Sequence, residues 1–150
     1  MIPVVDTSPQ IDQPFRLVVT GEAEDWLPAL SRLIAPEYVT LQRVGDDREL
    51  MEVVHAHGAD AAVLDDHAKW AIDGLRLLRM IRRFDAAFPV VVVTRHQDRQ
   101  FLEVALKLRA YSVVRAPLEF EQLVGQIYGM MQQMEARLRR GRAQDNPFSF

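Results

Sequence analysis

The feature that most constrains the fold is a run of four consecutive valines, residues 90–93, which lies between Pro89 and Thr94. Valine is β-branched and favours the extended backbone of a strand. Apolar side chains on both sides of a strand need cover on both faces, which is typical of parallel sheets flanked by helices. The run therefore predicts a buried central strand in an α/β fold.

Short apolar runs and capped amphipathic stretches alternate along the rest of the chain. We expect strands at residues 15–20, 38–44, 61–64, 89–94 and 111–114. We expect helices that begin near Asp25, at Asp46 or Asp47, at Gly74, at Asp98 and at Glu119, and that end near Pro36, Gly58, Phe84, Arg109 and Arg142. The first helix should face the core with Trp26, Leu30, Leu33 and Ile34. This alternation predicts a doubly wound α/β fold with a five-stranded parallel sheet.

Three regions follow from composition along the chain. Residues 1–14 contain three prolines and little periodicity, so we expect a flexible leader there. Residues 15–130 should form one folded domain, and residues 131–150 a helical extension with a tail. The N-terminus has no basic segment, and the chain has no run of about 18 apolar residues. We therefore expect a cytoplasmic protein that does not span a membrane.

Residue types needed for common enzyme chemistry are missing or badly placed. Cysteine is absent, which excludes disulfides, thiolate metal sites and thiol nucleophiles. No serine lies in a Gly-x-Ser-x-Gly context, and no glycine-rich phosphate loop follows the first strand. His55 and His57 are two apart on an expected helix and should face different ways, while His67 lies in a loop. We expect no enzymatic activity, no metal and no cofactor.

Charge is divided unevenly between the two halves of the chain. Residues 1–75 hold 14 acidic and 5 basic side chains, whereas residues 76–150 hold 7 and 13. Such a division is typical of a dipolar surface that steers partners. It is equally compatible with solvated charge spread by chance over one fold.

Polar residues follow four of the five expected strands, at the end of the sheet where the sites of open α/β folds lie. These segments are Thr20-Gly21-Glu22, Asp65-Asp66-His67, Thr94-Arg95-His96 and Arg115-Ala116-Pro117. With the runs 60–65, 72–78, 89–94 and 108–118 around them, residues 15 to about 130 resemble the receiver domain of two-component response regulators. The resemblance implies a flavodoxin-like signalling domain with a phosphoacceptor aspartate after the third strand and a Thr/Ser switch at Thr94.

The departures from the family pattern concern the chemistry. Transfer of a phosphoryl group to a carboxylate needs a divalent cation held by oxygen ligands. The family's acidic pair after the first strand corresponds here to Thr20 and Gly21, and its lysine to Ala116. The aromatic switch position on the fifth strand corresponds to Val113. These replacements predict a pseudo-receiver that is not phosphorylated by the standard magnesium-dependent route.

The acceptor position has two candidates. Counting forward from the third strand favours Asp65, which directly follows the apolar run, and we prefer it. Counting back from Asp73-Gly74 favours Asp66. The alternative function is a phosphoacceptor that uses Asp65 or Asp66 in an altered acidic pocket with Glu22.

The last helix should continue beyond the domain. Its apolar positions step by three and four residues, which is typical of a coiled-coil seam; they are Val124, Ile127, Met131, Met134 and Leu138. We expect a homodimer through this seam and another signalling protein as partner. A basic cluster follows at Arg137, Arg139, Arg140 and Arg142, but no DNA-reading motif accompanies it, so we expect no nucleic-acid partner.

Overall fold

The computed structural model describes residues 14–20, 27–66, 73–95, 98–115 and 120–145. Five strands form one parallel sheet in the order β2-β1-β3-β4-β5: β1 Phe15–Thr20, β2 Val39–Val44, β3 Ala61–Asp65, β4 Val90–Thr94 and β5 Ser112–Arg115. The helices are α1 Leu27–Leu33, α2 Asp47–His55, α3 Gly74–Phe84, α4 Arg99–Lys107 and α5 Phe120–Asp145. The predicted doubly wound, five-stranded fold is confirmed.

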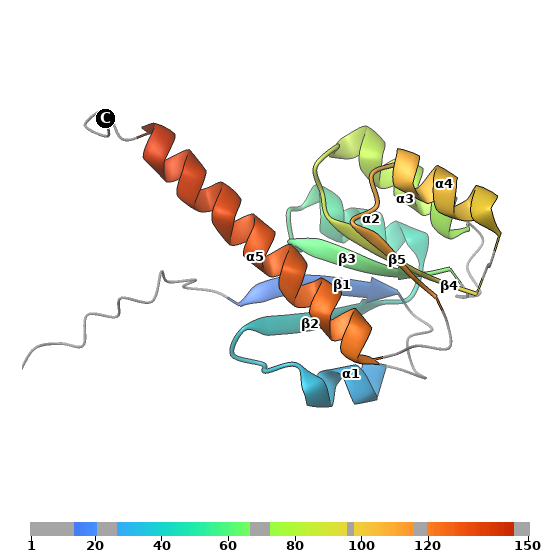
Figure 1. Ribbon diagram of the computed structural model, residues 1–150, viewed down its shortest axis with the longest axis horizontal. Coiled ribbons are helices and arrows are strands. Elements are labelled where there is room, and N and C mark those ends of the chain that lie inside the picture. Colours follow the sequence, from blue (N-terminus) through green and yellow to red (C-terminus); the bar gives the residue numbers. More distant parts are fainter. Residues whose placement is uncertain (1–13, 21–26, 67–72, 96–97, 116–119, 146–150) are drawn as a thin grey trace, which may run out of the picture.

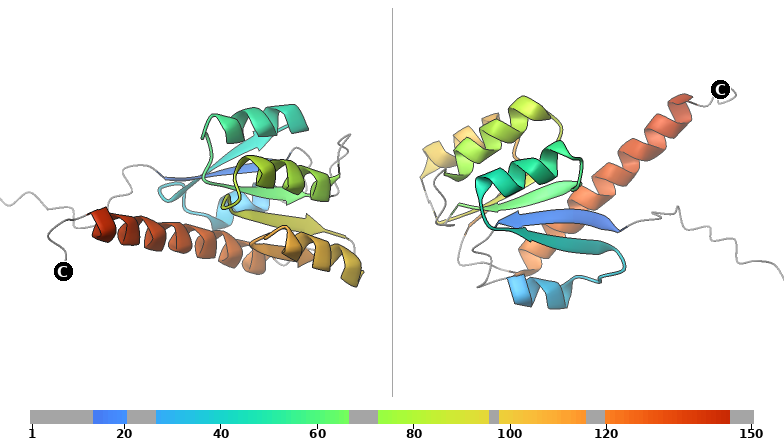
Figure 2. Two further views of the ribbon diagram at one scale, coloured as in Figure 1. Left: turned by 90° about the horizontal axis from the view of Figure 1, so that it is seen from above. Right: turned by 180° about the vertical axis from the view of Figure 1, so that it is seen from behind.

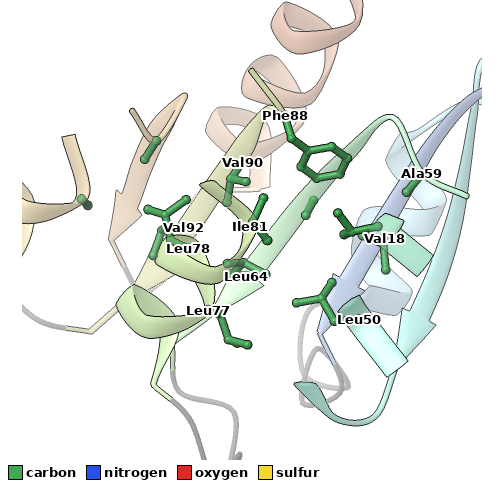
Figure 3. Packing of buried hydrophobic residues seen from close by; sticks show 14 of the residues in the cluster. Val18, Leu50, Ala59, Leu64, Leu77, Leu78, Ile81, Phe88, Val90 and Val92 are labelled. Carbon is green, nitrogen blue, oxygen red and sulfur yellow. The ribbon is translucent and has the colours of Figure 1, made fainter. Parts of the chain in front are cut away.

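Helices cover both faces of the sheet (Figures 1 and 2). On one face α1 and α5 pack through Leu30, Ile127 and Met130 against alternate strand residues. On the other face α2, α3 and α4 pack over the intervening residues. Figure 3 shows Leu77, Leu78 and Ile81 of α3 pointing toward β3 and β4. All four valines of β4 are buried, as the run of consecutive valines predicts.

Aspartates begin three of the helices. The carboxylates of Asp46, Asp73 and Asp98 accept hydrogen bonds from backbone N–H groups three residues further along the chain. These contacts satisfy donors that a helix start leaves unpaired, and they cap α2, α3 and α4. The three caps confirm the helix starts expected from the sequence.

One apolar position of α1 differs from the prediction. Leu30 and Ile34 are buried as expected, but Leu33 is 52% exposed. Leu33 is the last residue of the helix and lies at the margin of its apolar face. Asp25 and Trp26 lie outside the described residues.

The packing of α5 places part of the expected seam against the core of the domain itself. Ile127 is fully buried in the domain's own core, and Met131 and Met134 are partly buried against that core. These side chains therefore pack against their own domain, whereas the sequence predicts that they pack against a second chain. Only Leu138, 51% exposed, continues the stripe without cover among the described residues. The end of α5 projects past the end of the sheet where the strands begin (Figure 1).

An arginine joins the C-terminal ends of α3 and α4. The guanidinium of Arg82 donates hydrogen bonds to the carbonyl oxygens of Leu108 (2.7 Å), Arg109 (2.9 Å) and Phe88. Burial lowers the pKa of Arg82; neighbouring Asp85 opposes this and Arg109 adds to it. The side chain thus supplies donors to carbonyl groups where two helices end and β4 begins.

Within the described residues, no helix is long and apolar enough to cross a membrane.

Candidate functional site at the ends of the strands

The carboxyl ends of β1, β3 and β4 bring together four of the residues singled out in the sequence. Thr20 and Thr94 end their strands and are buried, while Asp65 and Asp66 at the end of β3 are half-buried. Strand pairing sets this arrangement, because Val19 lies opposite Val63 and Asp65 lies opposite Val93. The predicted positions therefore form one small cluster in the described part of the chain.

Thr20 joins the ends of β1 and β3. Its side-chain oxygen accepts a hydrogen bond from the backbone N–H of Asp65 at 2.9 Å. The side chain is fully buried, with a relative exposure of 0%. A neutral hydroxyl thus occupies the end of β1 and is already used as an acceptor.

The carboxylate of Asp66 lies against the start of α3. One oxygen accepts a hydrogen bond from the backbone N–H of Gly74 at 2.8 Å. Gly74 makes this approach possible, because a Cβ atom at that position would lie 2.6 Å from the same oxygen. The first N–H groups of a helix favour negative charge, and the Asp66 carboxylate lies at one of them.

The other Asp66 oxygen faces the end of β4. The hydroxyl of Thr94 donates to it in a long hydrogen bond of 3.5 Å, and the Asp66 backbone N–H donates to the carbonyl of Val93 at 2.8 Å. Asp66 therefore connects β4 with α3.

Several predicted positions cannot be placed in this cluster. Gly21, Glu22, His67 and Ala116 lie outside the described residues. Val113 is described: it is half-buried on β5 and packs against the core beneath α3 and α4.

The family model for the response regulator receiver domain matches residues 17–128 of the chain. The chain belongs to the response regulator receiver family. This match runs from within β1 through the other four strands to the first part of α5, and it confirms the resemblance drawn from the strand ends. No curated protein matches the chain in sequence.

Solved receiver structures share the fold at low sequence identity. The signal receiver domain of an HD domain-containing protein from Pseudomonas fluorescens Pf-5 matches with a TM-score of 0.75 and 16% identity, covering 89% of this chain and 98% of that one. A CheY-like receiver domain protein from Methanospirillum hungatei JF-1 gives 0.72 and 14%, covering 83% and 99%. NtrX from Brucella abortus gives 0.72 and 16%, covering 88% of this chain but only 30% of that one.

Within the described residues of this receiver, no group of three or more His, Asp or Glu side chains could hold a metal ion. In this cluster the described acidic side chains are Asp65 and Asp66. Oxygen-seeking cations such as Mg²⁺ bind through carboxylates, substrate phosphates and water. The described part of the cluster thus offers carboxylates from β3 and neutral hydroxyls from β1 and β4.

His55 and His57, near the end of α2, were predicted to face different ways on one helix, but their rings lie near the same aromatic side chain. His57 lies beyond the helix end with a left-handed backbone, φ 55°. Both imidazole rings therefore lie near the ring of Phe84, with centroid distances of 4.3 Å for His55 and 6.0 Å for His57. The prediction assumed that the helix continues to Gly58.

A hollow of about 280 Å³ lies at the opposite end of the receiver, where the strands begin. The Arg16 guanidinium and the Asp60 carboxylate form an ion pair at its wall at 3.1 Å, and the Arg16 backbone N–H donates a hydrogen bond to the same carboxylate at 2.8 Å. The hydrogen bond to Asp60 raises the pKa of Arg16, against the effect of burial. Met134 and Arg137 of α5 line the same hollow.

Two contacts of the site were missed in the sequence. The first is the docking of Asp66 onto Gly74, although the eight-residue spacing that also favoured Asp66 as acceptor was visible. The second is the Thr20 hydrogen bond to Asp65, which depends on the pairing of β1 with β3 and leaves no local signal.

Proposed function

We propose that this receiver is a signalling module that acts by binding another protein and is not phosphorylated by the standard magnesium-dependent route. The observation that carries the proposal is the buried Thr20 hydroxyl bonded to the Asp65 N–H. In the receiver family an acidic pair after the first strand supplies oxygen ligands to the divalent cation that holds an incoming phosphate beside the aspartate. Thr20 supplies a neutral oxygen at that position. Gly21 and Ala116, at the two other positions where the chain differs from the family pattern, supply no charge.

The same reasoning assigns a structural role to Asp66. Its carboxylate accepts from Gly74 and from Thr94, so it stabilises the junction of α3 and β4. Asp65, preferred from the sequence, and Asp66 both stay candidates for the vestigial acceptor, and the contact of Asp66 with the Thr94 hydroxyl supports Asp66. The module has no catalytic role in this account.

Magnesium binding tests the proposal directly. Calorimetric titration of the intact chain with Mg²⁺ should show no binding at millimolar concentrations. The triple variant Thr20→Asp, Gly21→Asp, Ala116→Lys should gain binding, whereas a matched variant with asparagine at positions 20 and 21 should not. Binding of Mg²⁺ by the unaltered chain, lost in Asp66→Asn, would contradict the proposal.

A second candidate function is a phosphoacceptor with an altered acidic pocket. The observation that favours it is the contact between the Asp66 carboxylate and the Thr94 hydroxyl at 3.5 Å, which retains an acid beside a hydroxyl at the strand ends. On this alternative, a phosphodonor would modify Asp65 or Asp66 and replacement of Thr94 by alanine would change the yield.

We also propose that the receiver forms a homodimer through the end of α5. The supporting observation is Leu138, which is 51% exposed on a helix that projects beyond the sheet. An isolated helical segment of this kind is marginal in water unless its apolar side is covered. Sedimentation should give a dimer that Leu138→Asp dissociates, while Leu33→Asp, at a residue 52% exposed on α1, should not. A monomeric intact chain would contradict the dimer and leave the signalling proposal standing.

A further inference from the structure

A row of arginines runs along the outward face of α3. Arg76, Arg79 and Arg83 follow one another at spacings of three and four residues and are exposed. These spacings bring side chains onto one face of a helix. The opposite face, with Leu77, Leu78 and Ile81, points into the core (Figure 3), so the arginine row points away from the domain.

The charges of this row have no ion-pair partner among the described residues. The helix contains four arginines and no acidic residue. No carboxylate of the described residues forms an ion pair with Arg76, Arg79 or Arg83; the described pairs on α2 and α4 join Arg48 to Glu52 and Arg99 to Glu103. An uncompensated row of this kind attracts negative charge and raises the rate of encounter with an acidic surface.

The row has an apolar border on the side of α2. Met80 is half-buried, and Phe84, four residues further, is 43% exposed beside His55. Arginine, methionine and aromatic side chains are enriched at protein–protein interfaces. The combination is therefore an amphipathic surface with positive charge along the helix and apolar contact area next to it.

We propose that the outward face of α3, formed by Arg76, Arg79 and Arg83 with Met80 and Phe84 beside them, is a docking surface for an acidic amphipathic helix of a partner protein. A helix with carboxylates at spacings of three and four residues would place them along the arginine row. An apolar side chain on the flank of that helix would cover Met80 and Phe84. The inference rests on the proposed function as an interaction module and names the class of partner.

The apolar border favours a protein over a nucleic acid. Phosphate contacts use the positive charges alone and gain nothing from Met80 or Phe84. An acidic helix uses both parts of the surface. Duplex DNA is therefore the natural competitor in the test.

The test uses a fluorescent helical peptide with glutamates at the matching spacings and leucines on one flank. Fluorescence anisotropy should show binding to the intact protein that weakens as salt rises. Arg76→Glu with Arg83→Glu should weaken it about tenfold or more, since each reversal replaces attraction with repulsion. Phe84→Ala should weaken it less. The control variant Arg32→Glu with Arg115→Glu, two exposed arginines on α1 and β5, should change it by less than about twofold.

Three results would overturn the inference: no binding of the peptide, equal losses in the α3 and control variants, or DNA binding that exceeds peptide binding and ignores Phe84→Ala. None of these results involves Mg²⁺ or the acceptor aspartates. Failure of the docking surface and failure of the proposed function are therefore distinguishable.

Discussion

The hydroxyl of Tyr111 lies against Gly129 of α5, so closely that a Cβ atom at position 129 would be 2.5 Å from the hydroxyl oxygen. Tyr111 precedes β5 and packs against the core on the α5 side of the sheet. The absence of a side chain at Gly129 thus lets the last helix approach β5.

Alanine at Gly129 should destabilise the receiver by about 1–3 kcal/mol, because the Tyr111 ring must move. Gly125 of the same helix has no atom within 4 Å of its ideal Cβ position, so Gly125→Ala should stabilise the protein by up to about 1 kcal/mol through helix propensity. Urea unfolding gives both values. Tyr111→Phe should restore tolerance of Gly129→Ala, and persistence of the full cost in that background would refute the contact.

Substitution of Arg82 should cost more than substitution of any arginine in the exposed row. Arg82→Met leaves carbonyl oxygens of Phe88, Leu108 and Arg109 without these donors, and we expect a loss of about 2–4 kcal/mol in the free energy of unfolding. Arg79→Met, at an exposed position, should change it by less than about 0.5 kcal/mol. Equal losses in the two variants would show that the carbonyl contacts contribute little.

Gly74→Ala should disrupt the end of β3 through Asp66. The added Cβ would displace the Asp66 carboxylate from the start of α3, at a cost of about 1–3 kcal/mol. In the background Asp66→Ala the same change should cost clearly less, since no carboxylate remains to be displaced. A double-mutant cycle by chemical unfolding measures the difference, and strict additivity would argue against the contact.

Thr20→Val preserves the shape of the buried side chain and removes its oxygen. The Asp65 N–H then loses its partner, and we expect a loss of about 1–2 kcal/mol. Thr40→Val, at an exposed position of the edge strand β2, is the control and should be nearly neutral. Hydrogen exchange at the Asp65 amide should also accelerate in Thr20→Val alone.

The fold was predictable because its signals are local. Each signal lies within a few neighbouring residues. The valine run marks a buried strand, and the aspartates mark helix starts at Asp46, Asp73 and Asp98. The sequence could not show that Met131 and Met134 pack against the core of their own domain. Packing on a sheet and packing on a second helix both require apolar residues at spacings of three and four. The contacts of Thr20 and Asp66 depend on strand pairing and on the position of α3, which no local pattern records.

Intact-mass measurement after incubation with acetyl phosphate and Mg²⁺ tests the central claim most directly. The account predicts that the chain keeps its unmodified mass, because the end of β1 carries the buried Thr20 in place of a carboxylate. A stoichiometric phosphoryl adduct that disappears in Asp66→Asn or in Asp65→Asn would contradict it and establish the chain as a phosphoacceptor.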